Sequence, residues 1–155
     1  MKIFLQIAVV FFAVQVYGQT NVSSKLYAKD LKLANAAFET EDYLNAINLY
    51  RKVLSIDPDN EKANLNSVIS RLKLSQAPDS CYSHIVKLKN CETPEVQYYF
   101  GLFYHLTSNF DEAIKYFTKY KEINPKYRSI TDDEVNYRIG CSKNAIDIIS
   151  QPHRS

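Results

Sequence analysis

The most restrictive feature of the sequence is a set of eight positions that recur 67 residues further along the chain. The earlier set is Ala34, Ala37, Tyr43, Ala46, Tyr50, Val53, Ile56 and Pro58, and the later set is Gly101, Tyr104, Phe110, Ala113, Phe117, Tyr120, Ile123 and Pro125. The constant offset equals about two units of roughly 34 residues less one. The sequence therefore predicts an array of structural repeats.

The later copy, Thr93–Pro125, has the pattern of two amphipathic helices. Thr93 before Pro94 is typical of a helix start, because the hydroxyl can accept from a free backbone N–H and proline suits the first helical position. Apolar residues then follow at helical spacing on both sides of the polar turn Thr107–Asn109. Pro125 is expected to end the second helix, since it disfavours the helical conformation of the residue before it.

The spacing of the small and aromatic residues resembles the tetratricopeptide repeat. The matching pattern is Phe100-Gly101-x-x-Tyr104, then Ala113-x-x-x-Phe117, then Pro125, while Gln97 stands where the family has tryptophan. The resemblance implies that two helices cross closely at Gly101 and Ala113. It predicts an all-α fold, a tetratricopeptide-repeat α-solenoid of three helix-turn-helix repeats and a C-terminal capping helix.

The predicted boundaries follow from this register. The repeats are expected at about 27–60, 61–93 and 94–127, with the second one degraded, and the capping helix at 131–149. Thr131 and Glu134 are expected to form a capping box at the start of that helix. The repeat domain then covers 26–150, between a flexible lead-in at 19–25 and a disordered tail at 151–155.

The first 18 residues have the pattern of a secretory signal peptide. Lys2 precedes the apolar run Ile3–Val16, and Val16-Tyr17-Gly18 offers a cleavage site after Gly18. A membrane anchor or buried N-terminal helix is less favoured, because the run is shorter than a spanning helix needs. We expect an exported chain in the periplasm or at the periphery of the outer membrane, with no transmembrane anchor after cleavage.

The remaining composition favours binding over chemistry. The net charge is +2 without a basic stripe, so nucleic acid is not an expected partner. His84, His105 and His153 lack metal-ligand spacing, and Asp132-Asp133-Glu134 is explained by a helix start. With no catalytic motif present, we expect no enzymatic activity, no cofactor and no metal.

The three cysteines leave two possibilities open. Unpaired packing is favoured over a disulfide for Cys81, Cys91 and Cys141, because Cys81 and Cys91 would lie about 15 Å apart if both were helical. A bridge between those two would need Cys91 to have left the helix. The odd number leaves at least one free thiol in either case.

The family resemblance implies a partner-binding groove for a protein or peptide, formed by the first helix of each repeat. Its expected residues are Leu31, Asn35, Phe38, Leu65, Asn66, Ile69, Lys73, Tyr98, Leu102, His105 and Tyr137, with Lys62 and Cys141 beside them. Asn35 and Asn66 match the two asparagines of the family's carboxylate clamp, but the clamp cations are absent. An apolar, aromatic groove with two amides is therefore predicted. Tyr98 and Tyr137 have the alternative of packing on adjacent helices.

The chain also resembles the N-terminal repeat block of exported Bacteroidetes envelope proteins that continue into a β-propeller and an OmpA-like domain. The shared segments are Leu33–Phe38, Tyr99–Gly101 with Phe110–Ile114, and Ile139–Ala145. This resemblance implies outer-membrane or type IX secretion-machinery proteins as partners. It implies two alternatives, an envelope scaffold that binds a partner, or a truncated or stand-alone relative with a structural stacking role.

Overall fold

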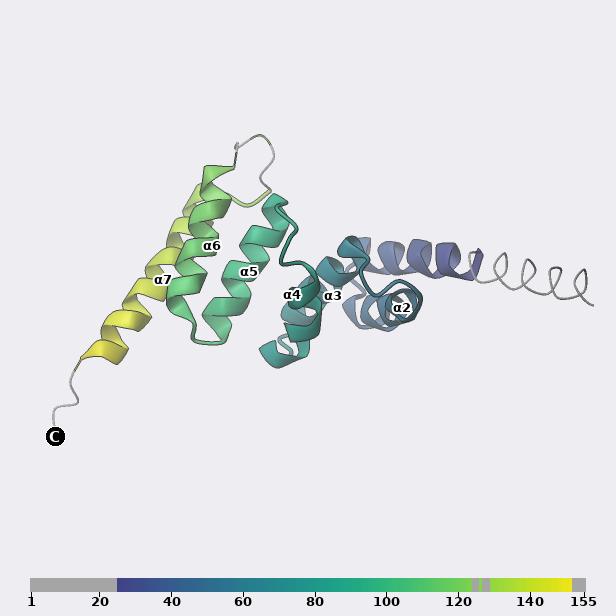
Figure 1. The fold of residues 1–155 in the computed structure, drawn as a ribbon, viewed down its shortest axis with the longest axis horizontal. Helices are drawn as coiled ribbons and strands as arrows, with labels where there is room; N and C mark the ends of the chain where they lie inside the picture. The colour runs from purple at the N-terminus through teal and green to yellow at the C-terminus, as the bar shows by residue number, and fades with distance from the viewer. Residues whose placement is uncertain (1–24, 124–125, 127–128, 152–155) are drawn as a thin grey trace, which may run out of the picture. The chain divides into compact units, whose positions relative to one another are not determined.

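The structure is a computed structural model that describes residues 25–123, 126 and 129–151, and its regular elements there are all helices (Figure 1). This confirms the predicted all-α fold. The signal peptide, Pro125, His153 and residues 19–24 of the lead-in lie outside the described residues. Lys25, which the sequence placed in the flexible lead-in, is helical.

The helices follow one another along the chain. They comprise residues 25–39, α2 (Tyr43–Ile56), α3 (Glu61–Lys73), the 3₁₀ helix η1 (Pro78–Cys81), α4 (Tyr82–Lys87), α5 (Pro94–Leu106), α6 (Phe110–Glu122) and α7 (Asp132–Ser150). The chain divides into two compact units, one ending at Ala63 and the other beginning at Asn64.

The first unit packs the helix at residues 25–39 against α2. Its core consists of small residues around one aromatic ring: Ala34, Ala37, Ala46, Tyr50, Val53 and Ala63. Asp42 caps α2 by accepting from the Asn45 N–H at 3.3 Å. Asn60 caps α3 by accepting from the Ala63 N–H at 2.9 Å, while its amide donates to the Tyr27 hydroxyl at 2.8 Å. One side chain thus joins the start of α3 to the first helix.

The second unit is organised around the crossing of α5 and α6, which lie beside α7 in Figure 1. A Cβ added at Gly101 would lie 2.5 Å from the ring of Phe117, so the two helices meet there as closely as glycine allows. Phe117 is fully buried beside Tyr98, Ala113, Tyr120 and Val135. The small residue and the aromatic residue of the repeat pattern therefore form one contact.

The second repeat is shorter than its neighbours. Its second helix begins with a 3₁₀ turn at Pro78 and becomes α-helical only at Tyr82. Proline at the start of η1 suits an opening turn, since it has no N–H to place. Cys81 is fully buried against Val68 and Val96, so it fills the position of the small residue.

Two expected helix caps differ from the prediction. Thr93 is the N-cap residue of α5, yet its hydroxyl makes no capping bond and lies 3.8 Å from the Cys91 sulfur. Thr131 does accept from the Glu134 N–H at 3.3 Å. The Glu134 carboxylate turns to Arg138 Nε at 2.8 Å and the Tyr98 hydroxyl at 3.2 Å, where a charged donor competes with the backbone. Only half of the capping box forms.

Candidate partner-binding surfaces

The predicted groove residues of the first unit are partly used within their own repeat. Asn35 accepts a hydrogen bond from the Tyr50 hydroxyl at 2.8 Å, so its amide oxygen orients a core tyrosine. Phe38 is half-buried and meets the Tyr43 ring edge-on at 6.0 Å between centroids. Leu31 is half-buried against the core of this unit.

The groove residues of α3 in the second unit range from buried to exposed. Asn66 and Ile69 are buried, and Leu65 is half-buried against the core of this unit. Lys73 is exposed at the end of the helix. The sequence could not separate these cases, because positions on one helical stripe differ in how much neighbouring chain covers them.

Two of the predicted groove residues of α5 form hydrogen bonds with α7. Tyr98 is only 5% exposed, and its hydroxyl donates to Glu134 at 3.2 Å, which is the packing alternative for this residue. Leu102 is half-buried against the same core. His105 lies 2.9 Å from the Ser142 hydroxyl through Nδ1. Because Ser142 donates to the Arg138 carbonyl at 3.1 Å, its oxygen accepts from a His105 Nδ1–H.

Several side chains of α7 are exposed to solvent, unlike the α5 residues that pack against this helix. Tyr137 is 63% exposed, and its ring lies beside the Arg138 guanidinium, 5.8 Å from centroid to Cζ. The nearby Cys141 thiol, one helical turn further along α7, raises the pKa of the Tyr137 phenol. Leu106 on α5 and Ile148 and Ile149 on α7 are also more than half exposed. The second unit therefore presents several large apolar side chains to solvent.

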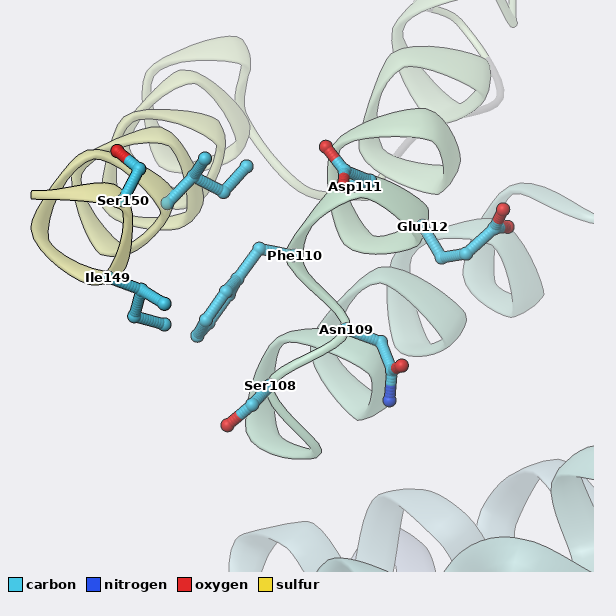
Figure 2. A pocket seen from close by; sticks show the side chains of 8 residues that line it. Ser108, Asn109, Phe110, Asp111, Glu112, Ile149 and Ser150 are labelled. Carbon is cyan, nitrogen blue, oxygen red and sulfur yellow. The ribbon is translucent and has the colours of Figure 1, made fainter.

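A cleft of about 460 Å³ lies between the start of α6 and the end of α7. Figure 2 shows the Phe110 ring pointing towards Ile149, while the Asn109 and Glu112 side chains extend away from it. Glu112 pairs with Lys115 at 3.0 Å and lies with Asp111 in the first turn of α6, where carboxylates stabilise a helix. The ion pair with Lys115 and the position in the first turn of α6 thus account for both acidic residues at this cleft.

Another groove, which sequence reasoning missed, lies between α4, α5 and α6 and has a volume of about 360 Å³. Tyrosines line it from all three helices, namely Tyr82, Tyr104 and Tyr116. The repeat pattern identifies Tyr104 only as a core residue. The signal in the sequence is the presence of aromatic residues beyond those that the pattern needs, at Tyr82 and Tyr116.

Few side chains in the described part of the chain carry reactive chemistry. No group of three or more His, Cys, Asp or Glu residues there is arranged to hold a metal ion. Cys81, Cys91 and Cys141 are all described and all unpaired, and burial raises the pKa of the Cys81 thiol. None of the helices at described positions is long and apolar enough to cross a membrane.

Two half-buried histidines predict a pH dependence of stability. Burial, followed by the nearby arginine, lowers the pKa of His84 beside Arg71 and of His105 beside Arg138. The folded pKa values lie below the unfolded value of about 6.5, so this stability is present above that pH and is lost as the pH falls through the folded values. The melting temperature of the full chain should therefore drop between pH 7 and pH 5, above the range where ordinary carboxylates titrate.

The control is the double variant His84→Gln/His105→Gln. Its side-chain amides can still form hydrogen bonds at both positions, but they do not titrate. Its melting temperature should fall less between pH 7 and pH 5 than that of the parent chain. An equal fall in the two proteins would show that other groups cause the dependence.

The comparisons with known proteins agree with this architecture. A sequence model described as tetratricopeptide repeat matches residues 31–60 and 94–127. The fold matches the crystal structure of the Sgt2 TPR domain from Aspergillus fumigatus with a TM-score of 0.59 and 20% sequence identity, over 86% of each chain. A search of curated proteins gave no match. Repeats of this family are in general non-catalytic scaffolds that bind protein or peptide partners. Two matched repeats on this helical fold identify the chain as a tetratricopeptide repeat protein.

Proposed function

We propose that this protein is an exported, non-catalytic scaffold that holds a protein or peptide partner in the bacterial cell envelope. The observation that carries the proposal is the exposure of large apolar side chains on a repeat array, above all Leu106 and Tyr137 in the second unit. Large apolar side chains left exposed on the surface of a repeat array are candidates for partner contact. Export is supported by the apolar run Ile3–Val16 and the small residues before Gln19.

The exposed positions allow a test that leaves the fold intact. A photo-reactive phenylalanine analogue at Tyr137 should cross-link an envelope protein in living cells, and Leu106→Glu should reduce that cross-link strongly. The matched control is the same analogue at Lys143, which is exposed on a polar part of α7. Equal cross-linking from positions 137 and 143 would contradict a specific surface at Tyr137.

Export has its own measurement. Mass spectrometry of the chain purified from the periplasmic fraction should give a mature N-terminus at Gln19. A chain that retains Met1 and remains in the cytoplasm would overturn the envelope part of the proposal. The protein-binding part would then still rest on the cross-linking result.

A second candidate function is a stacking role in an envelope assembly, as a relative of OmpA-like or type IX secretion components. It is favoured by Ile148 and Ile149, which are 71% and 69% exposed near the end of α7. Self-stacking through these side chains predicts a molar mass that rises with concentration in light scattering. Ile148→Glu should abolish the rise, whereas a concentration-independent monomer would argue against self-stacking.

A further inference from the structure

The groove between α4, α5 and α6 lies on the side of α5 opposite the predicted partner-binding residues. Phe103, Tyr104 and Thr107 of α5 face this groove. Tyr98 and His105 of the same helix bond to α7 instead. The helical period of 3.6 residues places these two sets on opposite faces. The groove is therefore separate from the surface in the proposed function.

The floor of the groove is a stack of aromatic rings. Tyr116 stacks on Phe100 at 4.9 Å between centroids and on Tyr104 at 5.3 Å, with interplanar angles of 25° and 13°. Tyr82 and Val86 of α4 form one wall, and both are well exposed. A rigid stack presents flat apolar surface with little conformational entropy to lose on binding.

Three phenol hydroxyls at this groove lack partners. The hydroxyls of Tyr82, Tyr104 and Tyr116 form no hydrogen bond with any described residue, unlike those of Tyr50 and Tyr120. All three tyrosines line the same groove, and the rings of Tyr104 and Tyr116 lie 5.3 Å apart between centroids. The groove thus offers several hydrogen-bond donors above an aromatic floor.

The charged groups at the rim favour an acidic ligand. Lys89 lines the groove, and Lys119 lies beside it with its Nζ 5.2 Å from the centroid of the Tyr116 ring. Neither lysine forms an ion pair with a described residue. The opposing charge is Asp79, because Glu112 is already paired with Lys115 at 3.0 Å. The two lysine ammonium groups have no ion-pair partner among the described residues and face one carboxylate, so the rim of the groove has a net positive charge.

The shape of the groove restricts the ligand further. Its walls are helices, whose backbone groups are bonded internally, so a peptide cannot add to them as a strand. A helical ligand has its carbonyls bonded internally too, so those carbonyls are not free to accept from the phenol hydroxyls of the groove. A polyproline II segment meets both limits, because it is narrow and has no internal hydrogen bonds. Its carbonyls can accept from tyrosine hydroxyls while proline rings pack on the aromatic floor.

We propose that the groove between α4, α5 and α6 binds an extended, proline-containing segment of another protein that carries an acidic residue beside its prolines. Tyr82, Tyr104 and Tyr116 donate to its carbonyls. Lys119 and Lys89 bind its carboxylate. This is a second binding surface, and it stands independently of the proposed function at Tyr137.

The probe is a fluorescein-labelled peptide with two prolines on each side of an aspartate, titrated with the full chain and followed by fluorescence polarisation. We expect saturable binding that weakens roughly 2- to 10-fold for each hydroxyl removed in Tyr82→Phe, Tyr104→Phe and Tyr116→Phe. These changes retain the rings, so the fold and the aromatic floor remain. Lys119→Glu should weaken binding further, and Tyr137→Phe should leave it unchanged.

Two further peptides test the chemistry of the ligand. One replaces every proline by alanine and the other replaces the aspartate by lysine, and both should bind at least several-fold more weakly. Equal binding of the alanine peptide, weakening by Tyr137→Phe, or no saturable binding of the proline peptide would each overturn the proposal. The cross-link from Tyr137 to an envelope protein is a separate measurement in cells, so failure of this site is distinguishable from failure of the proposed function.

Discussion

Gly101→Ala should lower the free energy of unfolding by about 1–3 kcal/mol, although alanine is the better helix former. The added Cβ would lie 2.5 Å from Cδ1 and Cε1 of Phe117. That ring cannot move aside easily, because it is fully buried and lies against Tyr98 at 5.7 Å between centroids. The overlap must be relieved by separating α5 from α6. Chemical denaturation of the full chain measures the loss.

The chain provides a control at the equivalent position of α7. Gly140 follows Tyr137 by three residues, as Gly101 follows Tyr98, yet a Cβ there meets nothing within 4 Å. Gly140→Ala should therefore raise the free energy of unfolding by about 0.5–1 kcal/mol through helix propensity alone. If both variants shifted stability in the same direction, close crossing would not explain the glycine at position 101.

This pair of glycines shows what the sequence predicts well. The register that aligns Ala34 with Gly101 and Tyr50 with Phe117 predicted helices and core positions, because Ala34 and Tyr50 share the core of the first unit while Gly101 meets Phe117 in the second. It also placed Gly140 correctly on a helix. It could not show that an added Cβ at Gly140 would have no neighbour within 4 Å, because the sequence of α7 does not indicate which residues pack against that position.

Polar side chains were harder to predict than the core. Thr93 and Glu134 are suitable capping residues, but each finds another partner within reach, the Cys91 sulfur or Arg138 and Tyr98. Such choices between competing partners differ by roughly one hydrogen bond, about 0.5–1.5 kcal/mol. Local sequence alone does not resolve differences of that size.

The candidate surfaces have the same difficulty. Tyr98 and Tyr137 each lie three residues before a glycine, yet one is buried and the other is 63% exposed, since α7 covers only the first. The tyrosines at the groove of α4, α5 and α6 were missed because their distinctive property is an absence of partners among the described residues. Only coordinates can establish which groups remain unpaired.

Tyr120→Phe should cost about 1–3 kcal/mol in the free energy of unfolding, although only one oxygen is removed. Tyr120 is fully buried, and its hydroxyl both donates to the Ile130 carbonyl at 3.0 Å and accepts from the Ile130 N–H at 2.7 Å. It thereby fixes the backbone just before α7 to the end of α6. The variant leaves both backbone groups of Ile130 without this partner.

The matched control for this change is Tyr116→Phe, one helical turn earlier on α6. The Tyr116 hydroxyl bonds to none of the described residues, so removing it should alter the free energy of unfolding by less than about 0.5 kcal/mol. Amide hydrogen exchange gives a local readout, because the Ile130 N–H should exchange faster in Tyr120→Phe and unchanged in Tyr116→Phe. Equal stabilities and equal exchange in the two variants would mean that the Tyr120 hydroxyl does not hold the start of α7, and that the packing of its ring against Tyr98 at 5.8 Å is sufficient.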